Sequence, residues 1–404
     1  MTAPAKTVLQ LTEYVPVSFP PEAIPEALGV ALYCNYSSQV AVEPPSFKTD
    51  YMWGLTSQGW VGYIPLSPEL GLELKPAGEL GNLFRMLEYA YRLKSFRFLE
   101  GLIGCRSLPE FYERLANVLA RRVLDRGRQG FYRAYTPRTE QLPYVRGRLD
   151  MRQVIRKPWD IGLHCHYEEH TADTEENQIL AWTLFVIARS GMCTERVLPT
   201  VRRAYHALRG FASVEPRGSR DCVGRLYNRL NDDYQSLHAL CRFFLEHSGP
   251  SHETGDRTVL PFLVNMKSLY QLFVAEWLRI HLPQGLLLKV QEKVDIGAGR
   301  VLSFVIDLVV CDAGTGAALC VLDTKYKYEE KPGPDDVVQV VAYAEVEGCQ
   351  KAALIYPAPV AQPLDEHVGK IRVQSMVFSL QGDLEAAGQA FVQDLLSSCA
   401  AQLR

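Results

Sequence analysis

The chain has 404 residues and a formal net charge of −3, with 47% hydrophobic and 22% charged residues. This composition is that of an ordinary soluble globular protein with room for two or three domains. No run of 18 or more uncharged apolar residues occurs, which argues against a membrane-spanning helix. The N-terminus lacks the pattern of a secretory signal, and the ten cysteines form no C-x-x-C pair. We therefore expect reduced thiols and a cytoplasmic location.

The first 145 residues are expected to form a β-rich module followed by two helices. The segments VALYC, YMWGLTS, GWVGYIPL and LGLELKP have a period of two and are separated by turns containing Gly and Pro, as in short strands. Apolar residues at helical spacing then predict helices over residues 82–93 and 108–127, with Gly127 as the C-terminal stop of the second. A domain boundary near residue 145 fits this pattern.

A basic segment lies between Arg121 and Lys157. It contains eleven Lys or Arg residues against three acidic residues, which gives it a net charge of +8. A local positive excess in a near-neutral chain is typical either of a phosphate-binding surface or of a solvated helix face and loop, and composition does not decide between them. Residues 129–158 are also rich in turn-forming residues and poor in apolar periodicity.

Residues 146–255 are expected to form a helical region. Helical spacing predicts helices over residues 174–191, 194–211 and 228–247, and Thr174 is a candidate N-cap of the first. The polar segment 247–256 is predicted to be a linker.

Three histidines and a cysteine just before these helices raise the possibility of a zinc site. They are His164, Cys165, His166 and His170. Their spacing is not that of a standard structural zinc site, and no second cluster completes a ligand set. We favour a polar loop or local packing for this segment.

Residues 256–404 have the clearest pattern, and we expect them to form a separate domain. A helix over residues 259–282 precedes the strands LLLKVQ, VLSFVIDLVVC and ALCVLDTKYK, the helix DVVQVVAYAEVEG and the strand KAALIYP. A further strand and a closing amphipathic helix complete the chain. The order α-β-β-β-α-β predicts a mixed sheet flanked by helices, and the whole chain is expected to have a mixed α+β fold.

Two aspartates interrupt the apolar strands of the hairpin formed by residues 302–327. A turn centred near residue 315 places Asp307 opposite Asp323, and opposed residues have Cβ atoms about 4.5–5.5 Å apart. Lys325 is two positions beyond Asp323 and should emerge on the same face, because strand side chains alternate. A register error of one residue would weaken this pairing.

The position of these aspartates in apolar strands favours a metal site. An unpaired carboxylate in a buried strand costs several kcal/mol or has a raised pKa, and two adjacent carboxylates repel each other. A divalent cation such as Mg²⁺ removes both penalties, and Lys325 beside it could activate water and stabilise charge on a phosphate. The alternative is structural, with Asp307 and Lys325 as a buried ion pair and Asp323 at the end of its strand.

Two further polar residues favour the functional interpretation. Gln339 and Tyr343 are four residues apart on the next helix and therefore share one face. Asp307, the D-T-K sequence at 323–325 and this Q-x-x-x-Y pair together resemble the PD-(D/E)xK nuclease superfamily, in particular its RecB-like branch. The strings LDTKYK, FLVNMKSLYQLFV and GWVGYIPL also resemble the McrC family, the nuclease subunits of 5-methylcytosine-dependent McrBC restriction systems, over nearly the whole chain.

This resemblance implies a type IV restriction endonuclease subunit with a C-terminal PD-(D/E)xK domain. Its catalytic residues would be Asp307, Asp323, Lys325, Gln339 and Tyr343. Mg²⁺, with Mn²⁺ as a substitute, would be held by Asp307, Asp323 and the Thr324 carbonyl. Lys325 would assist the attacking water, while Gln339 and Tyr343 would orient the site or the DNA strand.

The resemblance also implies a partner, an McrB-like AAA+ hexamer that hydrolyses GTP and acts with this subunit on methylated double-stranded DNA. The sequence contains no G-x-x-x-x-G-K-[ST] loop, so we expect GTP to be bound by the partner only. The N-terminal module is expected to dock on the hexamer, and residues 121–157 are a candidate region for stimulating its GTPase. A non-cleaving activator of an AAA+ motor and a stand-alone repair nuclease are the alternatives.

One position departs from the family pattern. Members often carry an acidic residue after an L-[FY] pair on the helix ahead of the sheet, whereas Gln271 follows that pair here. Either Gln271 holds a metal-bound water, or Glu276 five residues on takes the role. We expect activity with weaker metal affinity.

Overall fold

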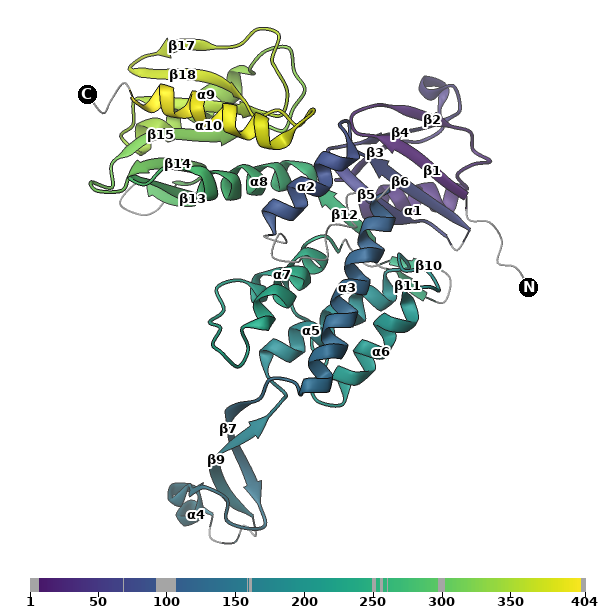
Figure 1. Ribbon diagram of the computed structural model, residues 1–404. Helices are drawn as coiled ribbons and strands as arrows, with labels where there is room; N and C mark the ends of the chain where they lie inside the picture. Colours follow the sequence, from purple (N-terminus) through teal and green to yellow (C-terminus); the bar gives the residue numbers. More distant parts are fainter. Residues whose placement is uncertain are drawn as a thin grey trace. The chain divides into compact units, whose positions relative to one another are not determined.

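The computed structural model describes residues 7–67, 69–91, 107–157, 159, 162–248, 252–254, 257–259, 261–296 and 302–400 (Figure 1). The chain divides into two compact units, one made of Met1–Leu108 and Leu263–Arg404 and the other of Pro109–Phe262. Across the described ranges, no helix has the length and apolarity needed to span a membrane. Several sheets and ten α-helices make up the molecule as described, so the expected mixed α+β class is confirmed.

The first unit begins with the expected β-rich module. A four-stranded sheet has the order β1-β6-β5-β12, and an antiparallel three-stranded sheet has the order β2-β4-β3. The strands are β1 (Thr7–Thr12), β2 (Val17–Phe19), β3 (Val40–Glu43), β4 (Trp53–Ser57), β5 (Trp60–Pro65), β6 (Leu70–Lys75) and β12 (Phe262–Asn265). Leu11, Leu55 and Leu72 are fully buried in the core that the strands share. Alternation predicted β4, β5 and β6, whereas β1, β2, β3 and β12 were not predicted as strands.

The predicted strand VALYC is wrong, because it lies in helix α1 (Glu26–Tyr36). Leu32 and Tyr36, four residues apart, are the buried residues that anchor the helix, together with Gly29. A Cβ at Gly29 would lie 2.3 Å from the buried Trp53 ring, so this close approach requires glycine. A 3₁₀ turn, η1 (Phe47–Thr49), follows β3.

The helix predicted over 259–282 is corrected at its start. Residues Phe262–Asn265 form β12, whose backbone pairs with β5, and only then does α8 (Met266–His281) begin. Asn265 sets this boundary, since its side chain accepts a hydrogen bond from Ser268 N. The helix predicted over 82–93 is α2 (Leu80–Ala90), and residues 92–93 lie outside the described ranges.

The C-terminal part of the first unit has the expected elements in the expected order around a six-stranded sheet, with one strand, at Asp365–Val368, that was not predicted. The strand order is β13-β14-β15-β16-β18-β17, antiparallel from β13 to β15 and parallel from β15 through β16 to β18. The elements are β13 (Leu286–Ile296), β14 (Leu302–Asp312), β15 (Ala318–Thr324), α9 (Pro334–Val346), β16 (Lys351–Tyr356), β17 (Asp365–Val368), β18 (Ile371–Val377) and α10 (Leu384–Ala400). Helix α9 buries Val340 and Ala344 against Val309 and Leu354 of the sheet. Phe273 of α8 and Phe391 of α10 both pack on Phe378.

The second unit combines helices with an extended hairpin (Figure 1). Its elements include α3 (Leu108–Gln129), β7 (Ala134–Leu142), β8 (Arg148–Leu149), α4 (Met151–Arg156), β9 (Leu163–Thr171), α5 (Glu175–Arg189), α6 (Leu198–Arg209), η4 (Ser219–Cys222) and α7 (Asp233–Glu246). The three predicted central helices are therefore present. Thr174 is the N-cap of α5, although its side chain makes no capping hydrogen bond.

The division between units differs from the expected boundaries near residues 145 and 255. Helix α3 packs on α7, with the Phe111 and Phe243 rings 6.0 Å apart, and β7 pairs with β9 along its whole length. Residues 109–145 therefore belong with the helical region. Helix α3 continues past Gly127 to Gln129, and the left-handed residue after it is Gly130, with φ +99°.

The segments expected to be a turn-rich stretch and a linker contain regular structure. Residues 129–158 include β7, β8 and α4, and Figure 1 shows α4 at the end of the β7–β9 hairpin away from the helices. The strand β7 has a largely exposed polar face, which hides its period from a search for apolar alternation. In the expected linker, β10 (His252–Thr254) pairs with β11 (Arg257–Val259), and residues 249–251 and 255–256 lie outside the described ranges.

Candidate active site

The hairpin of β14 and β15 has the register predicted from its turn. Leu308 pairs with Leu322 and Val309 with Val321, so the next position along the ladder places Asp307 opposite Asp323. A bulge between Val310 and Cys311 changes the pairing only on the turn side of these residues. The prediction of the register is confirmed where the pairing is observed.

Asp307 is held by groups from two elements. Its Oδ2 atom accepts hydrogen bonds from the backbone N of Thr324 at 3.0 Å and from the Thr324 hydroxyl at 2.9 Å. Its Oδ1 atom accepts from Nε2 of Gln271 on α8 at 2.7 Å. Burial nevertheless raises the pKa of Asp307, because these hydrogen bonds do not fully replace the lost water.

Asp323 is a buried carboxylate, with only 2% of its surface exposed. Its Oδ2 atom lies 2.7 Å from Lys325 Nζ and forms an ion pair with it, which lowers the pKa of Asp323 but does not outweigh burial. Burial and the adjacent charge of Asp307 raise the pKa of Asp323 to about 6. The two aspartates therefore interact directly, as expected for carboxylates that share a site.

Lys325 connects the hairpin to α9. Its Nζ atom lies 3.1 Å from Asp336 Oδ1 and donates to Gln339 Oε1 at 2.8 Å, besides its contact with Asp323. Burial alone would lower the pKa of Lys325, but the two carboxylates outweigh it and raise the pKa. Gln339 in turn donates from Nε2 to the Tyr343 hydroxyl at 2.7 Å. All five residues expected to be catalytic thus belong to one connected cluster.

Asp336, the second carboxylate beside Lys325, was not predicted from the sequence. Lys327 Nζ also donates to Asp336 Oδ2 at 3.0 Å, and the two lysines lower the pKa of Asp336 despite its burial. A signal was present, because Asp336 is three residues before Gln339 and therefore lies on the same helix face. Tyr356, at the end of β16, was missed as well. Its buried hydroxyl has no hydrogen-bond partner among the described residues, and burial followed by the charge of Asp336 raises its pKa.

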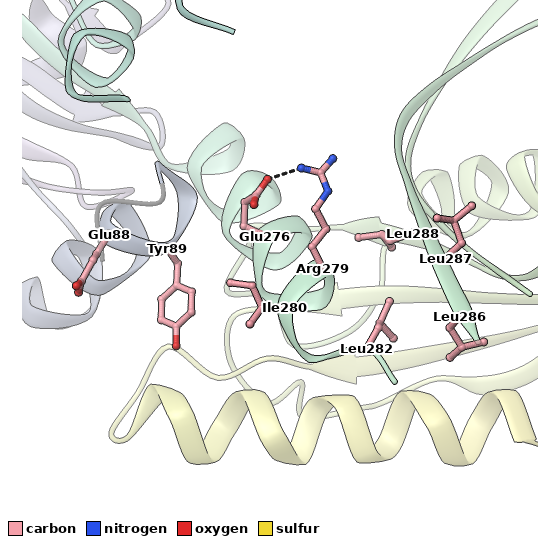
Figure 2. A pocket seen from close by; sticks show the side chains of 9 residues that line it. All are labelled: Glu88, Tyr89, Glu276, Arg279, Ile280, Leu282, Leu286, Leu287 and Leu288. Atoms are coloured by element: carbon pink, nitrogen blue, oxygen red, sulfur yellow. Dashed lines mark hydrogen bonds and ion pairs between the residues drawn. The ribbon is translucent and has the colours of Figure 1, made fainter. Parts of the chain in front are cut away.

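Gln271 and Glu276, the two candidates for the role of the family's acidic residue on this helix, have different surroundings. Gln271 reaches the cluster through Asp307, as described above. Glu276 instead forms an ion pair with Arg279 at 2.5 Å, in a pocket that Leu286, Leu287 and Leu288 also line (Figure 2). That pocket is lined by none of the cluster's residues. The structure therefore favours Gln271 over Glu276 as the side chain next to the aspartates.

The cluster fits an oxygen-liganded divalent cation. Asp323 is a buried carboxylate whose pKa stays raised despite its ion pair with Lys325, and its neighbour Asp307 is a second carboxylate of raised pKa. Both features disfavour the metal-free charged state, and a hard cation such as Mg²⁺ would offset that cost. No group of three or more His, Cys, Asp or Glu side chains suited to a metal occurs in the described part of the chain. The cluster offers two adjacent carboxylates, Asp307 and Asp323, with the Gln271 amide beside Asp307.

The histidines of β9 do not assemble a zinc site. His166 contacts the Thr139 hydroxyl at 2.8 Å and Asp150 at 3.5 Å, while His170 packs on the Tyr135 ring. Cys165 is buried and lies between two histidines that alternate to the other face of the strand. Local packing, the favoured interpretation, describes this segment.

The raised pKa of Asp323 predicts a pH-dependent gain of stability in Asp323→Asn. A carboxyl whose pKa is higher in the folded than in the unfolded state costs nothing below its unfolded pKa. The cost grows as pH rises from there and is complete above the folded pKa of about 6. The neutral amide removes that cost. In metal-free protein we expect the melting temperature of Asp323→Asn to exceed the wild-type value at pH 8, by about 2–4 °C, and to match it near pH 4.

Asp365→Asn is a control of opposite sign for these melting curves. Arg372 holds the pKa of this exposed carboxyl below its usual value, so the substitution should lower stability at pH 8 or leave it unchanged. If Asp323→Asn melted below the wild type at pH 8, burial of its charge would not be the dominant effect.

Comparison with known proteins places this cluster inside a recognised region. Residues 55–357 match a family model described as "McrBC 5-methylcytosine restriction system component". The chain is 26% identical over 221 residues to the type IV methyl-directed restriction enzyme EcoKMcrBC of Escherichia coli K12, an alignment that covers 51% of this chain and 60% of that protein. The match thus spans less than two thirds of the relative's length.

A solved structure has a similar fold over almost the whole chain. It is a chain of the refined half-complex from a tetradecameric assembly of Thermococcus gammatolerans McrB AAA+ hexamers with bound McrC. The TM-score is 0.55 at 17% identity, and the match covers 97% of this chain and 100% of that one. At this identity the likeness concerns the fold alone.

Proposed function

Because the chain belongs to the family of McrBC 5-methylcytosine restriction system components, we propose that it is the nuclease subunit of such a system. The cluster around Asp307, Asp323 and Lys325 is then a PD-(D/E)xK site that hydrolyses DNA phosphodiesters with Mg²⁺ or Mn²⁺. The observation that carries this proposal is the pair of interacting carboxylates with the Lys325 ammonium 2.7 Å from one of them.

Each residue of the cluster has a role that its contacts support. The carboxylates of Asp307 and Asp323 and the carbonyl of Thr324 would hold the cation. When bound, the cation supplies Lewis acidity toward phosphate oxygens and favours ionisation of water. The Lys325 ammonium orients the attacking water and offsets negative charge that develops on the phosphate. Gln339, itself held by Tyr343, fixes the position of that ammonium.

The proposal includes a partner, an McrB-like AAA+ hexamer that binds GTP and acts with this subunit on methylated double-stranded DNA. The similar solved chain comes from an assembly described as McrB AAA+ hexamers with bound McrC, which supports a partner of this kind. Three apolar side chains are exposed at the end of the β7–β9 hairpin. Tyr144 and Ile155 lie in the basic segment 121–157, and Trp159, which is 78% exposed, lies just after it. Exposed apolar side chains among charged residues are typical of protein-binding surfaces. This segment therefore remains the candidate region for GTPase stimulation.

A second candidate function rests on Gln271. With an amide beside Asp307, the chain could be a non-cleaving activator whose nuclease site has decayed. Reconstitution of the chain with its GTPase partner, GTP and methylated DNA in Mg²⁺ and Mn²⁺ separates the two functions. Cleavage that requires the partner supports the nuclease subunit, an inert complex in both metals supports the activator, and cutting without the partner supports a stand-alone nuclease.

Gln271→Glu is expected to tighten metal binding by about tenfold, because a third carboxylate would adjoin Asp307 and a cation offsets the added repulsion. Titration calorimetry with Mn²⁺ measures this change. Gln350→Glu adds the same charge at an exposed position and should leave the affinity unchanged. An equal affinity in the wild type and Gln271→Glu would mean that position 271 is outside the metal site. Cleavage gained only in Gln271→Glu would instead identify the wild type as the decayed form.

A further inference from the structure

A buried carboxyl group of the N-terminal module contacts the residue that follows Lys325. Glu13 directly follows β1 and is 1% exposed. Its Oε2 atom accepts hydrogen bonds from the Ala77 backbone N and from the Tyr326 hydroxyl, both at 3.0 Å. The other oxygen, Oε1, is buried and has no hydrogen-bond partner among the described residues. Burial of an incompletely hydrogen-bonded carboxyl group lowers the stability of the folded protein. We therefore asked what the hydrogen bond between Glu13 and Tyr326 contributes besides packing.

Tyr326 is the residue after Lys325, at a point where the regular structure ends. Strand β15 ends at Thr324, the Lys325 backbone N donates to Ile355 O at 2.8 Å, and residues 325–333 form neither helix nor strand. The next residue, Tyr326, has a buried side chain that is held by its hydrogen bond to Glu13. Its position therefore constrains the direction in which Lys325 leaves the strand.

The Tyr326 ring also contacts helix α8, which carries the Gln271 side chain next to Asp307. It lies 5.9 Å from the ring of Tyr270 on α8, and the Tyr270 hydroxyl donates to Phe378 O. The next residue of α8 is Gln271, which donates to Asp307. Tyr326 thus joins three parts of the first unit, namely β15, α8 and the N-terminal module.

We propose that Glu13 is a positioning residue of the nuclease site, which holds Tyr326 and thereby fixes Lys325 against Asp323 and Asp336. The inference rests on the proposed nuclease function and makes the N-terminal module part of the site's framework. The backbone next to Glu13 agrees with a constrained position, since Tyr14 has φ +60°, a left-handed conformation that tyrosine rarely adopts. Burial raises the pKa of Glu13 to about 7, so its neutral form is accessible near neutral pH.

The test compares four variants of the full chain in the complex with its GTPase partner. Tyr326→Phe and Glu13→Leu each remove the hydrogen bond, and each should lower kcat for DNA cleavage about tenfold, because a displaced catalytic group loses rate without loss of substrate binding. KM for DNA, Mn²⁺ affinity and GTPase stimulation should be unchanged. The double variant should lose the same tenfold rather than about a hundredfold, because both changes remove one interaction.

Glu13→Gln should keep the wild-type kcat. The amide oxygen can accept from Ala77 N and the Tyr326 hydroxyl, and the amide nitrogen takes the place of Oε1. Glu73→Leu, which removes a carboxylate of β6 that bonds Gln10, is the matched control and should have no effect on kcat. Additive losses in the double variant, an equal loss in Glu13→Gln, or a parallel fall in GTPase stimulation would overturn the inference. Unchanged cleavage in Tyr326→Phe would overturn the inference alone, whereas a wild-type complex that cuts no DNA would overturn the proposed function and the inference with it.

Discussion

Lys325→Ala is expected to lower DNA cleavage by the reconstituted complex by at least about 100- to 1000-fold, the range seen when a transition-state stabiliser is removed. The substitution takes the ammonium away from Asp323 and leaves Asp336 paired with Lys327 only. Stimulation of the partner's GTPase should persist, because the basic segment proposed for that role belongs to the other compact unit. Cleavage of methylated DNA and GTP hydrolysis are measured on the same preparation.

Lys327→Ala is the matched control for this variant. Lys327 is two residues away and also pairs with Asp336, but its side chain is 35% exposed, against 12% for Lys325. Its loss should change cleavage only a few-fold, since partly exposed ion pairs contribute little. Retained cleavage in Lys325→Ala would refute the assigned role. Equal losses in both variants would indicate a general effect of charge near the DNA.

Asp307→Asn should also lower cleavage by at least about 100-fold, because one of the two carboxylates proposed to hold the cation is lost. The amide can keep an acceptor for the Thr324 donors, so the hairpin should remain folded. Asp323 should then titrate at lower pH, because the charge of Asp307 is one of the causes that raise its pKa. Cleavage is measured over a range of Mg²⁺ and Mn²⁺ concentrations.

Asp312→Asn provides the corresponding control on the same strand. Asp312 accepts hydrogen bonds from Gly314 N and Thr315 N in the turn, so its substitution should affect stability and leave cleavage unchanged. Cleavage at the wild-type rate in Asp307→Asn would exclude Asp307 from the site. A comparable loss in Asp312→Asn would mean that the hairpin, and not a particular carboxylate, determines the rate.

The part of the site that the sequence could predict depends on local geometry. The short turn at 312–316 fixes which residues of β14 and β15 face each other, so the opposition of Asp307 and Asp323 follows from counting. The contact between Gln339 and Tyr343 follows from their spacing of four residues on α9, which places them on one helix face. The roles of these residues in DNA cleavage rest on the family resemblance and remain a proposal.

What the sequence could not predict depends on contacts between distant segments. The Glu13–Tyr326 hydrogen bond joins residues 313 positions apart, and neither residue has a local pattern that indicates the other. Phe262–Asn265 became a strand because β5 offers backbone partners, although the apolar spacing continues into the helix. Asp336 lies in the first turn of α9, where an acidic residue is also explained by the helix dipole, so its spacing from Gln339 did not by itself indicate a contact with Lys325.

Binding of Mn²⁺ to the isolated chain tests most directly whether the two aspartates form a metal site. Titration calorimetry at pH 8 should give saturable binding for the wild type and Asp312→Asn, and binding at least about tenfold weaker for Asp307→Asn. The wild-type affinity should fall as pH drops through about 6, where protons compete for Asp323. A wild-type chain that binds no Mn²⁺ at pH 8, or an Asp307→Asn chain that binds it equally well, would contradict the account.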